Sequence, residues 1–158
     1  MAETKQKVVV IAGPTASGKS GLAVDLSLLL QCEIVNADSM QVYRHMDVGT
    51  AKPSPAERRR VPHHLLDVVD PDQEFNAALY RSLALPVIRE VVARGKVCFI
   101  VGGTGLYIKT LLGGLLQCPT ADQGLREKLH EQAVEQGIEA MYRRLEELDP
   151  VSATKIHA

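Results

Sequence analysis

Short apolar runs and helical repeats of apolar residues alternate along the first part of the chain. The β-branched run 8–12 and the run 33–37 are typical of buried strands. Between them, the apolar residues of 21–30 recur at helical spacing. A strand, a helix and a second strand of this length predict a right-handed crossover within a parallel sheet.

A longer helix and a further strand follow. Asn76 is placed to cap a helix that extends to Arg94, and Gly95 is placed to end it. Pro86 predicts a kink or a split inside this helix. A buried strand is expected over 96–101. The residues expected on the apolar side of the helix are Leu79, Leu83, Val87, Ile88 and Val91.

The segment between the second strand and the long helix is less regular. Residues 44–62 contain Gly49 and several prolines and read as an irregular excursion. Three consecutive arginines, 58–60, are typical of a solvated helix face, with contact to a polynucleotide backbone as the alternative. Adjacent side chains diverge on any regular element. His63 and His64 therefore favour one core and one surface histidine over a metal site.

The pattern changes after Gly113-Gly114. From Asp122 the chain is polar and helical, and Asp149-Pro150 separates a last short helix that runs toward His157. These helices have too little apolar surface to close a core alone. The expected organisation is therefore an α/β core over 1–121 and the start of a helical domain over 122–158.

Composition narrows the class of protein. The 158 residues carry a net charge of −1, so no global positive field attracts the chain to nucleic acid. Cys32, Cys98 and Cys118 are widely separated, which argues against a disulfide framework and against a zinc site. This usage suits a reducing cytosol, and we expect a cytoplasmic protein. The N-terminal segment 1–7 is polar and is neither a signal peptide nor a membrane span.

The most specific chemical signal lies between the first strand and the first helix. Gly13 and Gly18 lack a Cβ, so the loop can curl and turn its backbone N–H groups toward a phosphate. Lys19 adds a full positive charge, and the Ser20 hydroxyl can ligate Mg²⁺. The full motif reads Gly13, Pro14, Thr15, Ala16, Ser17, Gly18, Lys19 and Ser20. Strand, glycine loop and helix form the setting that this phosphate-binding motif requires.

Two further positions belong to the same edge of the sheet. Asp38 follows the second strand and should stand close to the phosphate loop, with a helix N-cap as an equally good interpretation. After the strand 96–101, many phosphate-loop enzymes carry a metal-binding Asp, but this chain has Gly102-Gly103. Two glycines indicate that a ligand or backbone approaches closely. Thr104 then offers a hydroxyl at this edge, a cap for a helix over 106–112, or both.

Taken together, five segments resemble the serial motifs of tRNA dimethylallyltransferases, in order and in spacing. They are Gly13-Pro14-Thr15-Ala16-Ser17-Gly18-Lys19-Ser20, Asp38-Ser39-Met40-Gln41-Val42-Tyr43, Asp47-Val48-Gly49-Thr50-Ala51-Lys52-Pro53, His63-His64-Leu65-Leu66-Asp67 and Gly102-Gly103-Thr104-Gly105-Leu106-Tyr107. The resemblance implies a P-loop NTPase-like α/β core with a parallel sheet flanked by helices. It also implies transfer of a dimethylallyl group from dimethylallyl diphosphate to N6 of adenosine 37 of tRNA, beside the anticodon.

The resemblance also assigns roles to residues. It implies that Thr15 to Ser20 bind the diphosphate with Mg²⁺, that Lys19 stabilises the leaving group, and that Asp38 is the general base. It further implies that the target adenosine and the tRNA meet Asp38, Ser39, Met40, Gln41, Thr104 and Arg126. The expected partners are tRNA and dimethylallyl diphosphate, and we expect a monomer without membrane association.

Members of this family are considerably longer, and residues 122–158 correspond to the first helices of a tRNA-gripping insertion. Three alternatives remain open from the sequence. An adenylate dimethylallyltransferase uses a free nucleotide with the same core. A small-molecule kinase also suits a P-loop domain of this size. The third alternative is a non-catalytic fragment that binds only nucleotide or diphosphate.

Overall fold

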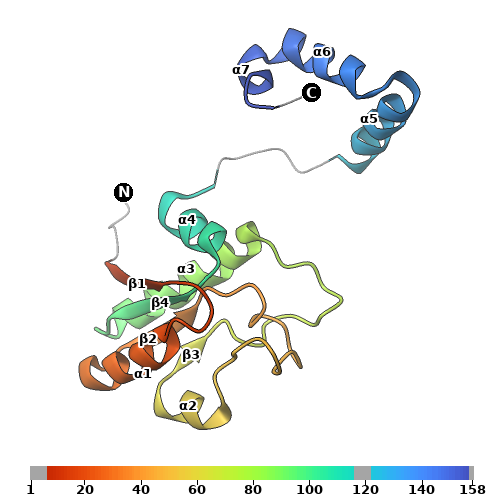
Figure 1. Cartoon of the computed structure of the whole chain (residues 1–158). Helices are drawn as coiled ribbons and strands as arrows, with labels where there is room; N and C mark the ends of the chain where they lie inside the picture. The colour runs from red at the N-terminus through yellow and green to blue at the C-terminus, as the bar shows by residue number, and fades with distance from the viewer. Residues whose placement is uncertain (1–6, 116–121, 157–158) are drawn as a thin grey trace. The chain divides into compact units, whose positions relative to one another are not determined.

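The computed structural model describes residues 7–115 and 122–156, which belong to two compact units, Met1–Leu115 and Leu116–Ala158 (Figure 1). Cys118, His157 and most of the polar N-terminal segment lie outside the described residues. Within the described ranges, no helix is both long enough and apolar enough to cross a membrane.

The first unit is built on a sheet of four parallel strands in the order β1-β4-β2-β3. This sheet, with helices on its faces, confirms the expected α/β class (Figure 1). The elements of this unit are β1 (Val8–Ala12), α1 (Lys19–Leu30), β2 (Glu33–Asn36), α2 (Pro55–Arg60), β3 (His63–His64), α3 (Ala77–Ala93), β4 (Cys98–Gly102) and α4 (Gly105–Gly113).

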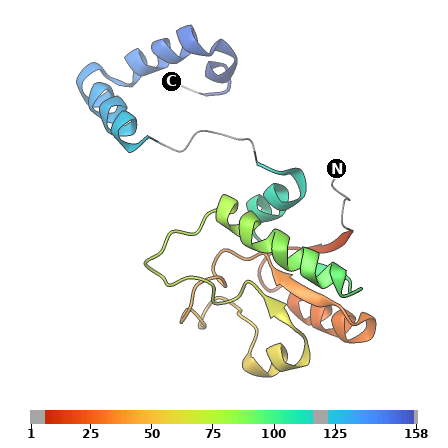
Figure 2. The same ribbon diagram turned by 180° about the vertical axis from the view of Figure 1, so that it is seen from behind.

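Strand β4 lies between β1 and β2 and carries the core on both faces. All of its residues are buried, as expected for a central parallel strand. Cys98 and Ile100 pack into a cluster with residues of α3 and α4, whereas Phe99 and Val101 pack with residues of α1. Helix α1, in orange, accordingly lies in front of the strands in Figure 1, and α3, in green, lies in front of them in Figure 2.

The end of β4 shows why glycine is required at position 102. A Cβ on Gly102 would lie 2.2 Å from the carbonyl carbon of Ala37, at the end of β2. The expected close approach is therefore confirmed, and at this position the approaching group is backbone. This contact draws the end of β2 against the end of β4, where the phosphate loop also lies.

Helix α3 differs from the prediction in two respects. It is a single helix from Ala77 to Ala93, so Pro86 does not split it. Pro86 and Ser82, whose carbonyl loses its intrahelical donor, are both exposed, so water can replace the missing bond. The Asn76 cap is confirmed, because its side chain accepts from the amides of Ala78 and Leu79.

The buried side of α3 is also rotated from the expected one. Tyr80 and Ala84 are fully buried together with Ile88 and Val91. The expected core residues Leu79, Leu83 and Val87 are only half-buried. The phenol ring of Tyr80 stacks on Tyr107 of α4 at 4.5 Å between ring centroids, and this aromatic contact sets the face that α3 turns to the sheet.

The excursion over 44–62 contains one helix that the prediction missed. Helix α2 begins with a capping box, in which the Ser54 hydroxyl accepts from the Glu57 amide and Glu57 accepts from the Ser54 amide. Pro55 occupies the first helical position, where it is favoured. Arg59 and Arg60 are exposed, as expected for a solvated face, but Arg58 is half-buried and bonded.

The second unit consists of α5 (Gln123–Gln136), α6 (Ile138–Leu148) and α7 (Pro150–Ala153). Asp122 caps α5 through the Leu125 amide, and Tyr142 donates to the Ala153 carbonyl. Of the residues that the structure describes in this unit, only Ala153 is buried. This agrees with the expectation that these helices cannot close a core alone.

A buried carboxylate organises the end of the sheet where β2 begins. The side chain of Glu33 is only 4% exposed and accepts from His64 Nε2 at 2.8 Å, Arg94 Nη2 at 2.7 Å and Lys96 Nζ at 2.9 Å. Burial alone would raise the pKa of Glu33, but the hydrogen bonds from His64, Lys96 and Arg94 outweigh it and lower the pKa to about 2.

Replacing Glu33 by glutamine is expected to destabilise the first unit by about 3 kcal/mol at pH 7. Because the folded-state pKa is depressed, the carboxylate contributes fully above its ordinary pKa of 4.5 and loses its contribution as the pH falls toward 2. Urea unfolding of Glu33→Gln and of the unaltered chain should show that the difference in their free energies of unfolding is smaller at pH 3 than at pH 7.

The matched control is Glu90→Gln, because Glu90 shares the partner Arg94 but is 72% exposed. Its loss should cost less than about 1 kcal/mol. This account would be contradicted if the difference in free energy of unfolding between Glu33→Gln and the unaltered chain were the same at both pH values.

Candidate functional site

The phosphate loop joins β1 to α1 and contains two residues with left-handed backbone conformations. They are Ala16 and Gly18, with φ of 64° and 81°. Such left-handed residues let successive N–H groups converge on an anion, and the amides at the start of α1 add their partial positive charge. A Cβ on Gly13 would lie 3.0 Å from Ser17 Oγ, so a larger residue would force this side chain aside.

Lys19 and Ser20 are the first residues of α1, which begins earlier than the predicted range. Both side chains are half-buried. Lys19 Nζ donates to the Pro14 carbonyl at 3.1 Å, so the ammonium lies across the loop. In this position the charge is held next to the amides that an anion would approach.

Gly103 connects this loop to the neighbouring strand. A Cβ at this position would lie 3.2 Å from the Gly13 carbonyl oxygen. Gly102, the last residue of β4, and Gly103, which follows it, therefore approach backbone at two places, Ala37 and the phosphate loop.

Asp38 lies in a turn that follows β2, and it does not cap a helix. Its Oδ1 accepts from the Met40 amide at 2.9 Å, and its own amide donates to Asn36 Oδ1 at 3.2 Å. Within the described residues, its second carboxylate oxygen makes no hydrogen bond. Of the two interpretations left open by the sequence, the cap is wrong, because residues 39–42 form a turn.

Thr104 links this turn to α4. It occupies the N-cap position of α4, but its hydroxyl makes no cap bond and accepts instead from the Ser39 amide at 2.9 Å. The Thr104 amide donates to the Ala37 carbonyl at 3.1 Å. Of the interpretations left open for Thr104, the helix cap is therefore wrong, and the hydroxyl holds the turn next to Asp38.

A narrow pocket brings the two halves of the predicted site together. Lys19, Ser20, Asp38 and Gln41 all line it. The other lining residues are Asn36, Glu57, His63 and Pro53, with Ala23, Val24, Ile34, Leu66, Val101 and Gly102.

The two histidines of β3 point to different environments, and both are half-buried. The expectation of one core and one surface histidine is therefore wrong. His64 binds Glu33, whereas His63 lines the pocket. Burial lowers the pKa of His63, and its Nδ1 donates to the Val61 carbonyl at 2.8 Å. Since Nδ1 carries the proton of the neutral ring, Nε2 is left as an acceptor.

The other predicted residues have different settings. Gln41 is 8% exposed and its amide nitrogen is bonded to backbone, whereas Met40 is 45% exposed. Arg126 is an exposed residue of α5, in the second unit. The sequence interpretation missed His63, Glu57 and Lys52. The capping box around Glu57 was a local signal, but nothing local marks the other two.

A divalent cation at this site would depend on few protein ligands. Within 7–115 and 122–156, no three histidine, cysteine or acidic side chains gather into a metal-binding group. Mg²⁺ is commonly held by one or two protein oxygens together with substrate phosphates. The Ser20 hydroxyl, beside the phosphate loop and in the pocket with Asp38, fits that donor set.

Comparison with known proteins agrees with this geometry. The family described as IPP transferase matches residues 41–158, and the family described as isopentenyl transferase matches residues 6–70. The chain is 54% identical to a tRNA dimethylallyltransferase of Geobacter metallireducens and 56% identical to one of Geobacter sulfurreducens, over 98% and 99% of its own length. It spans about half the length of these curated relatives, 50% in each case.

Solved structures show the same likeness. A full-length tRNA isopentenylpyrophosphate transferase from Bacillus halodurans is 42% identical, with a TM-score of 0.70 over 97% of this chain and 51% of that protein. A eukaryotic dimethylallyltransferase acting on tRNA is 32% identical, with a TM-score of 0.80 over 97% of this chain and 38% of that protein.

Proposed function

Because the chain belongs to the IPP transferase family, the family of the tRNA dimethylallyltransferases, we propose that it transfers a dimethylallyl group from dimethylallyl diphosphate to N6 of adenosine 37 of tRNA. One observation carries the proposal. The phosphate-loop residues Lys19 and Ser20 line the same pocket as the carboxylate of Asp38. An anion-binding loop and a proton acceptor in one pocket are the two groups that this transfer needs.

The phosphate loop is proposed to bind the leaving group. Nitrogen N6 of adenine is a weak nucleophile, so the allylic carbon must become strongly electrophilic. As the bond between this carbon and the diphosphate oxygen breaks, the electron pair leaves with the diphosphate. Lys19 and the amides around Gly18 stabilise the charge that develops there.

Asp38 is proposed to complete the transfer as general base. As N6 bonds to the allylic carbon, its extra proton passes to the carboxylate. The turn supports this role, because Met40 and Thr104 hold it while one carboxylate oxygen has no hydrogen bond to the described residues. The target base must leave its stack to reach a pocket of this kind.

Magnesium is proposed to assist at the same loop. Ser20 would hold the ion through its hydroxyl, together with diphosphate oxygens. When bound, the ion supplies additional positive charge for the departing diphosphate. The remaining binding is done by the loop amides and Lys19.

We further propose that residues 13–20 bind the diphosphate. The second unit, including Arg126, is proposed to contribute to tRNA binding. The protein is proposed to act as a cytoplasmic monomer. The proposal for Arg126 is supported by its exposure on α5. The division at residue 121 into a catalytic core and a tRNA-binding domain remains a prediction.

The 158-residue chain is expected to bind diphosphate with Mg²⁺ but to modify tRNA poorly. The loop, strand and helix for the first activity lie within the first unit. Specific nucleic-acid interfaces bury roughly 1,000 Å² or more and use many lysines and arginines. This chain has a net charge of −1 and half the length of its relatives. Filter binding and label transfer at about physiological ionic strength test this expectation, by comparing the 158-residue chain with one extended to the length of its relatives. Robust transfer of the dimethylallyl group to tRNA by the 158-residue chain would contradict it.

Label transfer tests the proposed function against its alternatives. The chain extended to the length of its relatives is incubated with labelled dimethylallyl diphosphate and either tRNA, AMP or no acceptor. We expect label in tRNA. Label in AMP alone would favour the adenylate enzyme, and ATP consumption with a small acceptor would favour a kinase.

A further inference from the structure

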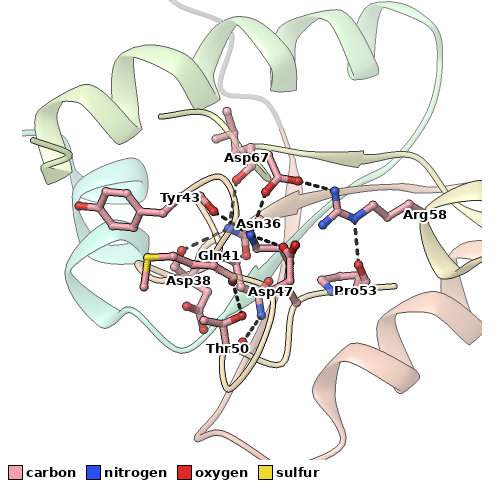
Figure 3. A network of polar contacts seen from close by, with 12 residues as sticks. Asn36, Asp38, Gln41, Tyr43, Asp47, Thr50, Pro53, Arg58 and Asp67 are labelled. Atoms are coloured by element: carbon pink, nitrogen blue, oxygen red, sulfur yellow. Dashed lines mark hydrogen bonds and ion pairs between the residues drawn. The ribbon is translucent and has the colours of Figure 1, made fainter. Parts of the chain in front are cut away.

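The ammonium group of Lys52 is buried within a polar network that also includes Asp47, Asp67 and Arg58. Figure 3 shows these three residues from close by. The side chain of Lys52 is 1% exposed. Its Nζ donates to the Tyr43 carbonyl at 2.7 Å, to Asp47 Oδ1 at 2.8 Å and to Asp67 Oδ1 at 2.8 Å. An ammonium group has three donors, so Lys52 is fully satisfied by this loop and by the segment after β3.

The network continues through Asp67 to α2. Arg58 binds the other oxygen of Asp67 and donates from Nε to the Pro53 carbonyl at 2.9 Å. Burial alone would lower the pKa of Lys52, but the hydrogen bonds that it donates to Asp47 and Asp67 outweigh this effect and raise the pKa. Lys52 is therefore charged at neutral pH and joins the loop 43–52 to the segment after β3.

The stretch that Lys52 holds lies outside the named helices and strands, and its backbone meets the segment after β3 through an isolated bridge between Tyr43 and Val69. Residues 39–51 form turns, and His45 and Ala51 adopt left-handed φ values of 62° and 50°. In the segment after β3, Leu65 and Asp67 also adopt left-handed φ values, of 60° and 55°. Such conformations cost about 1 kcal/mol or more each for residues other than glycine and persist only where surrounding contacts impose them.

The backbone next to Lys52 in turn fixes Gln41. Gln41 Nε2 donates to the Thr50 and Ala51 carbonyls, both at 3.1 Å. Since both partners are acceptors, the amide nitrogen faces them, and Oε1 is left as an acceptor. Gln41 lines the pocket together with Asp38.

We infer that Lys52 is a positioning residue, which orients Gln41 and the Asp38 turn toward the acceptor base by holding residues 43–52 against Asp67. The inference rests on the proposed function, because it assigns the acceptor side of the pocket to this loop. Lys52 acts through Gln41 and touches no substrate. Gln41 Oε1 accepts a hydrogen bond from the acceptor, which an exocyclic amine supplies.

The test uses Lys52→Met in the chain extended to the length of its relatives, because methionine keeps the length of the side chain and removes its donors. We expect kcat/KM for tRNA to fall about 10- to 100-fold, the scale of a misplacement of about 1 Å, with the affinity for Mg²⁺ and inorganic diphosphate unchanged. Amide hydrogen exchange should accelerate over 38–52 and remain unchanged in β1 and β4.

Lys96→Met is the matched control. It removes a lysine contact to the buried carboxylate of Glu33 at the opposite end of β2, although Lys96 itself is 40% exposed, and so lowers stability without touching the network. Its kcat/KM per folded molecule should equal that of the unaltered protein. If Lys96→Met lowers kcat/KM per folded molecule as much as Lys52→Met does, Lys52 has only a structural role and the inference is wrong.

The outcomes separate the inference from the proposed function. If the unaltered protein transfers label and Lys52→Met transfers it equally well, the positioning role is refuted alone. If the unaltered protein transfers none, the proposed function is refuted, and this role with it. If Lys52→Met does not fold, Asp47→Ala decides, since Asp47 is 68% exposed. A several-fold loss with faster exchange over 38–52 supports the inference, and no change overturns it.

Discussion

Replacing Asp38 by asparagine is expected to lower kcat by about 100-fold or more, the usual scale for loss of a general base. The affinity for dimethylallyl diphosphate should be unchanged. Asparagine keeps an oxygen at Oδ1, so it can still accept from the Met40 amide and preserve the turn. It cannot take a proton from N6. Single-turnover label transfer at saturating substrates, with the chain extended to the length of its relatives, measures the effect.

The control for this change is Asp25→Asn, which also neutralises one carboxylate. Asp25 is an exposed residue of α1. Its replacement should leave kcat unaltered. If Asp38→Asn behaves in the same way, Asp38 shapes the turn and takes no part in the proton transfer.

Replacing Lys19 by alanine is expected to weaken diphosphate binding by about 100-fold, the upper range for a charge-assisted hydrogen bond. The fold should persist. Lys19 is half-buried, its Nζ has one hydrogen bond, to the Pro14 carbonyl, and alanine is a strong helix former at the start of α1. Isothermal titration calorimetry of the 158-residue chain with Mg²⁺ and inorganic diphosphate measures the affinity.

Lys128→Ala is the control, because Lys128 is an exposed residue of α5 in the second unit. It should bind diphosphate as the unaltered chain does. If the Lys19→Ala protein folds and binds diphosphate with undiminished affinity, the proposal that the phosphate loop binds the diphosphate is wrong.

The phosphate loop could be predicted from sequence because its determinants are local. The glycines, the lysine and the flanking strand and helix lie within residues 8–30, and the φ of Gly18 follows from its lack of a Cβ. The meeting of this loop with Asp38 was predicted from a general property of parallel sheets. Ligand crevices lie at the carboxyl ends of the strands, and both groups are placed there.

The rest of the site depends on contacts between distant residues. Lys52 meets Asp67, and Thr104 meets Ser39, across stretches of chain that no periodic pattern connects. The caps left open as alternatives for Asp38 and Thr104 do not form, because each side chain has a competing partner in the turn that follows β2.

Helix α3 shows how tertiary packing overrides a local rule. Pro86 is an exposed residue within a continuous helix, where water can replace the lost bond. The stacking of Tyr80 on Tyr107 then sets which face is buried. Neither the exposure of Pro86 nor the partner of Tyr80 can be read from periodicity.

The central claim is that the phosphate loop and Asp38 together place a dimethylallyl group on N6 of an adenosine beside the anticodon. The most direct measurement is mass spectrometry of tRNA digested after reaction with isotope-labelled dimethylallyl diphosphate and the chain extended to the length of its relatives. The account predicts one labelled group per tRNA, on N6 of adenosine 37, and only a small fraction of that label with Asp38→Asn in the same reaction time. Label on another base or position, or unmodified tRNA with ATP consumed, would contradict it.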